Sequence, residues 1–92
     1  LVLHANRNAA AVEAVAGEVR AAGRNASVCL ADLADAAAVD TLGAELLEKV
    51  PSLDVLVHNA GLFEQVDFPA ITREAYRRMQ AVNVEAPFFL TQ

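Results

Sequence analysis

The sequence predicts an α/β fold in which a doubly wound parallel sheet is covered by helices on both faces. Short apolar runs rich in β-branched residues alternate with longer segments whose apolar residues recur at helical spacing. The order along the 92 residues is strand, helix, strand, helix, strand, helix. Strands that are unbroken apolar runs are typical of parallel sheets buried on both faces. We therefore expect one partial α/β domain that covers residues 1–92.

The first half of the chain is predicted to hold two strands, each followed by a helix. Residues 1–5 and 26–30 are apolar enough to be the strands. Asn8 and Asp35 follow them as good N-cap residues, because their side-chain oxygens can accept from the free N–H groups of the first helical turn. Gly23 is placed to end the first helix.

The second half is predicted to hold a third strand and a third helix. Pro51 closes the preceding helix, and residues 53–58 read as the strand. A loop is expected over residues 61–68. Thr72 then caps a helix that runs through Tyr76 toward the C-terminus.

The composition excludes several classes of function. The net charge of −5 provides no basic footprint for nucleic acid or an anionic membrane. No apolar run approaches the roughly 18 residues of a membrane span, and no signal-peptide pattern is present. The single cysteine, Cys29, is expected to be a small buried hydrophobe in a cytoplasmic protein. We expect a solvated helix face to carry the three neighbouring arginines, Arg73, Arg77 and Arg78. We also predict no metal site.

Polar or very small residues follow each predicted strand, where open parallel sheets bind their ligands. The three stretches are Asn6-Arg7-Asn8, Asp32-Leu33 and His58-Asn59-Ala60-Gly61. In the last one, Ala60 and Gly61 allow a flat or charged ligand to approach the backbone closely. Asn59 is able to bridge the backbone groups of neighbouring loops. An ordinary strand-to-loop turn is the alternative explanation of the same four residues.

Asn83 places a polar amide on the predicted apolar face of the last helix. Counting turns from Tyr76 reaches this position, so its side chain is expected to point inward and to need partners. Pro87, four residues on, has no N–H and leaves the Asn83 carbonyl without its normal helical donor. That carbonyl would then be free to hold a water molecule. A tolerated helix kink is the alternative.

Taken in order, these features resemble the short-chain dehydrogenase/reductase family. Asn-Arg, Asp-Leu and Asn-Ala-Gly follow successive strands, and Ala-Val-Asn-Val lies in the helix after them. The resemblance covers the whole chain and is closest to 3-oxoacyl-carrier-protein reductases and pteridine-reductase-like members, because of the stretch Leu-His-Ala-Asn-Arg-Asn. It implies a Rossmann-like sheet, of which this chain would supply family strands 2 to 4 with their helices.

The resemblance implies NADP as the cofactor, with NAD less favoured. At the end of the second family strand, an acidic residue would bind the ribose 2′-hydroxyl of NAD, whereas a basic one accommodates the 2′-phosphate of NADP. This chain has Asn6, Arg7 and Asn8 there and no acid. The guanidinium of Arg7 suits a phosphate dianion. Asn8 would be both a helix cap and a neighbour of the phosphate.

The resemblance also implies roles for the remaining site residues. Asp32 would contact the adenine amino group, and Leu33 would donate its backbone N–H. The stretch Asn59–Gly61 would line the cofactor. Asn83 would belong to the active-site tetrad and hold a water in the proton relay to a catalytic lysine. The family usually has Asn where this chain has His58, so the role of His58 is left open.

Two family motifs are missing from the 92 residues: the glycine-rich Thr-Gly-x-x-x-Gly-x-Gly loop and the catalytic Tyr-x-x-x-Lys. We therefore expect a central fragment that is inactive alone. Its parent would transfer a hydride between nicotinamide and a small carbonyl or alcohol substrate, as a homo-oligomer. The alternative is a non-catalytic flavodoxin-like signalling or interaction module. A receiver-like domain of this kind should carry paired acids at its first strand end and a lysine after a later strand. Leu1 to Arg7 holds no acid, and Lys49 lies within a predicted helix.

Overall fold

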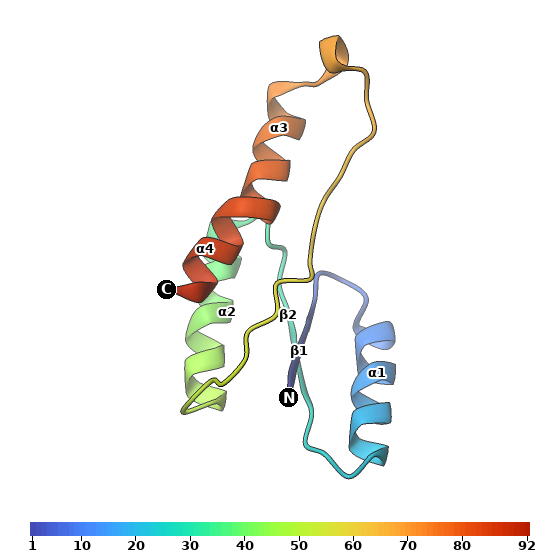
Figure 1. The fold of residues 1–92 in the computed structure, drawn as a ribbon, viewed down its shortest axis with the longest axis vertical. Helices are drawn as coiled ribbons and strands as arrows, with labels where there is room; N and C mark the ends of the chain where they lie inside the picture. Colours follow the sequence, from blue (N-terminus) through green and yellow to red (C-terminus); the bar gives the residue numbers. More distant parts are fainter.

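A computed structural model describes all of residues 1–92 and confirms the α/β class. The chain forms two strands, four α-helices and two short helical turns (Figure 1). In order they are β1 (Val2–Ala5), α1 (Ala9–Ala21), β2 (Ser27–Leu30), α2 (Ala36–Lys49), the 3₁₀ turn η1 (Phe68–Ala70), α3 (Arg73–Gln80), the π-helical turn η2 (Ala81–Glu85) and α4 (Ala86–Thr91).

The two strands form a parallel pair, as predicted. Val2 lies opposite Ser27 and Ala5 lies opposite Leu30, so the two carboxyl ends are level. Helix α1 makes the crossover between the strands, and α1 and α2 flank the pair on opposite sides (Figure 1). This register brings the residues after β1 and β2 to one edge of the sheet.

The predicted helix boundaries are confirmed by their capping contacts. The side chains of Asn8, Asp35 and Thr72 accept hydrogen bonds from first-turn N–H groups of α1, α2 and α3. Gly23 has a φ of 77°, the left-handed conformation that commonly ends a helix and that glycine adopts without strain. These boundaries depend only on contacts between residues a few positions apart, which is why the sequence reveals them.

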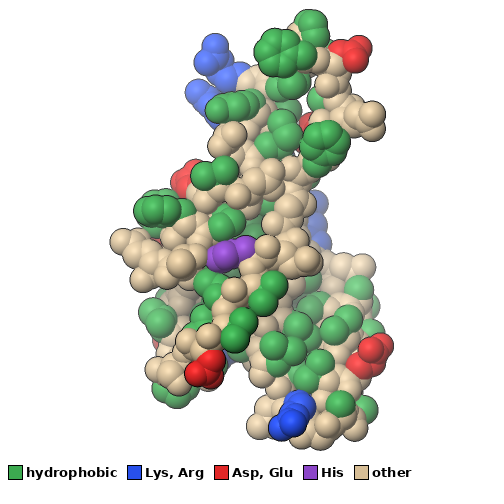
Figure 2. Space-filling view, viewed as in Figure 1, with side chains coloured by type: hydrophobic (Ala, Val, Ile, Leu, Met, Phe, Trp, Pro, Cys, Tyr) green, Lys and Arg blue, Asp and Glu red, His purple; other side chains and the backbone are tan.

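A small apolar cluster holds α2 against β2. Cys29 and Ala31 at the end of β2 are buried together with Leu42 of α2, and Leu90 of α4 packs against them. Cys29 is therefore the small buried hydrophobe that was expected. Outside this cluster, apolar side chains are spread over the visible face of the molecule (Figure 2). Leu47, Phe63 and Phe68 are among those that are largely exposed.

The prediction of a third strand over residues 53–58 is wrong for this chain. The segment forms no strand, and the sheet contains only β1 and β2. Val55 and Val57 are exposed. In the strand order 3-2-1-4-5-6, one further strand separates this segment from β1. No segment of residues 1–92 fills that position, so the backbone of 53–58 has no ladder partner.

The last predicted helix is present, but it is not uniform. α3, η2 and α4 follow one another without a break and form one rod, which we call the C-terminal helical rod (Figure 1). Within η2 the Ala86 N–H donates to the carbonyl of Ala81, five residues back rather than four. No helix of the structure combines the length and the apolar character that crossing a bilayer requires.

The isolated 92-residue chain should unfold over a broad range without a sharp cooperative transition. Only 8 of its 92 residues are buried, and two strands with one small cluster supply little cooperative packing. Its radius of gyration is 15.0 Å, whereas a compact domain of this length has about 12 Å. Circular dichroism during heating tests this, and a steep two-state melt would contradict it.

Candidate functional site

The carboxyl ends of β1 and β2 bring Arg7 and Asp32 together. Arg7 follows β1, and its Nη2 lies 3.6 Å from Oδ2 of Asp32, which follows β2. The side chain of Arg7 is 81% exposed, so this contact leaves most of its guanidinium open to solvent. Asn6, beside it, is exposed. The Asn8 side chain accepts from the Ala11 N–H at 3.0 Å and serves as the cap of α1.

Asp32 is the most constrained polar residue of this edge. Its Oδ1 accepts from the Ala34 N–H at 3.0 Å, and its side chain is 27% exposed. The Ala34 N–H and, after it, the guanidiniums of Arg78 and Arg7 hold the pKa of Asp32 below its usual range. Asp32 does not cap α2, because Asp35 makes that contact. Asp32 therefore remains as a charged acceptor at the sheet edge.

Two residues at this edge were not identified from the sequence. Arg78 of α3 was expected on a solvated face, but its Nη2 lies 3.9 Å from Oδ2 of Asp32. His4 of β1 donates from Nε2 to the carbonyl of Ala31, 2.9 Å away, and so ties the two strand ends together. Both contacts join residues far apart in the chain, and no local pattern signals them.

The neighbouring residues Leu33 and Asn59 have different surroundings. Leu33 is half-buried and packs against the cluster of Cys29, Ala31 and Leu42. Asn59 is exposed. The bridge that was expected from its side chain to neighbouring loops is not formed among residues 1–92.

The stretch Asn59–Gly61 is exposed, and nothing within the chain requires glycine at its end. Gly61 does not have a positive φ. A Cβ at this position would meet only Oδ1 of Asn83, at 3.7 Å, which is an ordinary van der Waals distance. The backbone and packing of residues 1–92 therefore do not explain the missing side chain, and within this chain the surface above Gly61 is open.

Asn83 holds the loop after Gly61 by a two-point contact. The Leu62 N–H donates to Oδ1 of Asn83 at 2.8 Å. Nδ2 of Asn83 donates back to the Leu62 carbonyl, also at 2.8 Å. The expectation that Asn83 is buried is wrong, since it is exposed in this chain. The expectation that its amide needs partners is right, and both partners are backbone groups of one residue.

The π-helical turn η2, which interrupts the regular α-helix, has Asn83 at its centre. Pro87 is the second residue of α4, four residues after Asn83, and has no N–H to donate to the Asn83 carbonyl. Single π-helical turns inside α-helices are rare and frequently occur at functional sites. The sequence predicted a disturbance here, whereas its form is evident only from the structure.

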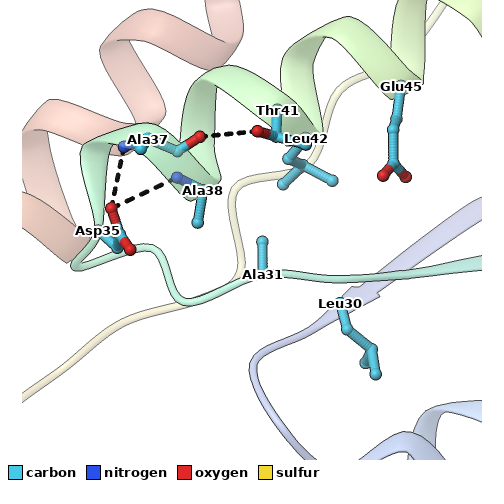
Figure 3. A pocket seen from close by; sticks show the side chains of 8 residues that line it. All are labelled: Leu30, Ala31, Asp35, Ala37, Ala38, Thr41, Leu42 and Glu45. Carbon is cyan, nitrogen blue, oxygen red and sulfur yellow. Dashed lines mark hydrogen bonds between the residues drawn. The ribbon is translucent and has the colours of Figure 1, made fainter.

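A shallow depression of about 350 Å³ lies between β2 and α2 (Figure 3). Its polar groups already have partners: the Asp35 carboxylate accepts from the N–H groups of Ala37 and Ala38, and the Thr41 hydroxyl donates to the Ala37 carbonyl. None of the predicted cofactor residues lines it. No group of three His, Cys, Asp or Glu side chains is placed to hold a metal ion. The sheet edge with the Asn59–Gly61 loop is therefore the better candidate.

Comparison with known proteins gives a consistent result over the whole chain. A family model described as short chain dehydrogenase matches residues 1–92. Sorbitol dehydrogenase of Cereibacter sphaeroides is 40% identical over 88 residues, which cover 96% of this chain and 33% of that protein. Sepiapterin reductase of Chlorobaculum tepidum is 33% identical over 87 residues, covering 95% of this chain and 36% of that protein. The chain thus spans about a third of the length of these relatives.

Solved structures superpose closely on the same residues. A short-chain dehydrogenase from Burkholderia cenocepacia J2315 in complex with NADP has a TM-score of 0.90 and 31% identity, covering 99% of this chain and 37% of that one. A landomycin C-6 ketoreductase with bound NADP and rabelomycin has a TM-score of 0.87 and 34% identity, with 99% and 40% coverage. These structures have the Rossmann fold, and the partial sheet described above is a portion of it.

Replacing Asp32 by Ala in the complete gene product should lower its melting temperature at neutral pH. Because the folded-state pKa of Asp32 is lowered, its stabilising contribution is complete above an unfolded pKa of about 4. It is lost as the pH falls through the lower folded value. The difference from wild type should therefore shrink below about pH 4. Asp54→Ala, which changes an exposed acid, is the control. A gap that persists unchanged in acid would contradict this assignment.

Proposed function

Because this chain belongs to the short-chain dehydrogenase family, we propose that it is the central, cofactor-contacting third of an NADP-dependent oxidoreductase. The complete enzyme would act on a small carbonyl or alcohol substrate, as a homo-oligomer. The bound cofactor would exchange a hydride with the substrate: NADPH would give it to a carbonyl, and NADP⁺ would take it from an alcohol. The catalytic tyrosine and lysine of the family have no counterpart in residues 1–92. We infer that these residues alone are inactive. With the family established, the flavodoxin-like alternative is no longer needed.

The observation that carries the proposal is the open surface at Gly61. A glycine that neither its own backbone nor its neighbours require is explained if a ligand lies against it. Asn83 fixes the adjoining Leu62 backbone at two points, so this surface is held in one position. A nucleotide ribose is the ligand that the family match favours, and the NADP complexes of similar structures support it.

Arg7 is proposed to select NADP over NAD. Its guanidinium is largely exposed and has one long contact, 3.6 Å, to Asp32. It is therefore able to turn toward a phosphate dianion, which it fits in geometry and in charge. Asn6 and Asn8 are proposed neighbours of that phosphate. No acidic residue occupies the end of β1, where a carboxylate would favour the free 2′-hydroxyl of NAD.

Asp32 and Leu33 are proposed to hold the adenine. The lowered pKa of Asp32 keeps its carboxylate ionised and able to accept from an exocyclic amino group. Leu33 follows on the same turn, and its backbone N–H is proposed as the partner donor. The family match and the location at the carboxyl edge of the sheet support both assignments.

Asn83 is proposed as the catalytic residue of this segment. Its side chain is occupied by Leu62, so any direct part in proton transfer falls to its backbone carbonyl. Pro87 removes the usual helical donor to that carbonyl, and the π-helical turn η2 widens the helix around it. We propose that it holds a water in the proton relay toward the catalytic lysine.

Replacing Arg7 by Ala in the complete enzyme should weaken NADP binding by roughly 10- to 100-fold, the range expected for a lost charge-assisted hydrogen bond. NAD binding should change little, since NAD lacks the phosphate. Titration of cofactor binding with each dinucleotide measures both constants. Arg24→Ala, an exposed arginine in the turn before β2, is the matched control. Equal losses for NADP and NAD would refute the phosphate assignment.

Replacing Gly61 by Ala should reduce cofactor affinity without reducing stability. The new Cβ would be at 3.7 Å from Asn83, an ordinary contact, so the fold should accept it. Fewer unfolded conformations should even stabilise the protein by about 0.4–1 kcal/mol. Gly17→Ala in α1, where nothing lies within 4 Å of the new Cβ, is the control and should leave affinity unchanged. Full cofactor affinity in Gly61→Ala would overturn the proposed ligand surface.

A further inference from the structure

The residues on both sides of the Asn59–Gly61 loop contact the C-terminal helical rod. Leu62 follows the loop and contacts Asn83, and His58 precedes the loop and makes a second contact. Nε2 of His58 lies 2.8 Å from Oγ1 of Thr91, at the end of α4. Together with the Asn83–Leu62 contact, this brackets the three residues of the loop. The sequence alone assigns no role to His58 and does not single out Thr91.

The direction of the His58–Thr91 hydrogen bond follows from the proton count. Oγ1 of Thr91 lies 2.7 Å from the carbonyl of Pro87 and donates its single proton to it. The hydroxyl oxygen then has only lone pairs left to offer. Nε2 of His58 must therefore be protonated and donate the hydrogen bond to Oγ1 of Thr91. A neutral His58 is thus the Nε2–H tautomer, with Nδ1 as an acceptor.

The spacing of the two contacts matches in the loop and in the rod. His58 and Leu62 are four residues apart, and four residues of extended chain span about 13 Å. Asn83 and Thr91 are eight residues apart, and eight helical residues span about 12 Å. The loop can therefore lie stretched along the rod with both ends attached.

We propose that His58 and Thr91 are positioning residues that hold the Asn59–Gly61 loop against the C-terminal helical rod, and so set the place of the cofactor-facing backbone. The proposal rests on the proposed function, because it takes this loop as the cofactor's surface. His58 is neither acid nor base in it. Its imidazole spans the distance to α4, where the Thr91 hydroxyl accepts a hydrogen bond from Nε2 while it donates one to the Pro87 carbonyl.

Thr91→Val in the complete enzyme should raise the Kd and the KM for NADP by roughly 2- to 10-fold, the range of one neutral hydrogen bond. The kcat at saturating NADP should change much less, because chemistry is not routed through Thr91. Thr91→Ser, which keeps the hydroxyl, should restore wild-type values. His58→Ala should cause a loss of similar size, and the double variant His58→Ala/Thr91→Val should be no worse than either one.

Thr41→Val is the matched control for helix stability. The Thr41 hydroxyl also donates to the carbonyl four residues back, that of Ala37, at 2.9 Å, and no hydrogen bond joins it to the Asn59–Gly61 loop. Thr41→Val should leave the KM for NADP unchanged, with melting temperatures recorded for every variant.

Three results would overturn the proposal: wild-type NADP affinity in Thr91→Val, no recovery in Thr91→Ser, or full additivity in the double variant. Failure of the proposed function would be distinct, since the wild-type protein itself would then not bind NADP. That result would remove the basis of both.

Discussion

The position of the candidate site depends on the two hydrogen bonds between the Asn83 side chain and the backbone of Leu62. Among residues 1–92 the segment that leads into this loop has no sheet partner, so within this chain the place of the loop depends on its contacts with the C-terminal helical rod. The Asn83 amide accepts from the Leu62 N–H and donates to the Leu62 carbonyl. A side chain that can only donate or only accept could not make both bonds. Within residues 1–92 the loop is thereby joined to the C-terminal helical rod.

The C-terminal helical rod also contacts the carboxyl ends of β1 and β2, through an ion pair. Arg78 of α3 faces Asp32, which also receives Arg7 from the end of β1. Three elements therefore meet at a single carboxylate, and this carboxylate is further held by the Ala34 N–H. Both arginine contacts are long and partly exposed, so each one alone contributes little to stability. Their value lies in orientation, because they hold the strand ends and α3 around one ionised group.

Much of the site could be predicted because its residues occupy the ends of recognisable elements. The N-caps Asn8, Asp35 and Thr72 form their bonds within three residues, and such contacts are visible in any short window of sequence. The disturbance around Asn83 was likewise predictable, because Pro87 removes a donor whatever surrounds it. The wrong prediction, a strand over residues 53–58, came from the same kind of local pattern. Apolar β-branched residues favour a strand, but a segment becomes a strand only when a neighbouring strand pairs with its backbone.

The sequence by itself determined the helices, their ends, the parallel pair and the order of polar groups after each apolar run. The helices and their ends follow from side-chain periodicity and from hydrogen bonds that reach only a few residues. The parallel pair follows from the alternation of apolar strands with amphipathic helices. Only the tertiary structure decided which distant residues meet. It pairs Arg78 with Asp32 by charge. It also forms the hydrogen bonds between Asn83 and Leu62 and between His58 and Thr91. These contacts join residues 21 to 46 positions apart. No local propensity encodes them, because which groups meet depends on how whole elements pack.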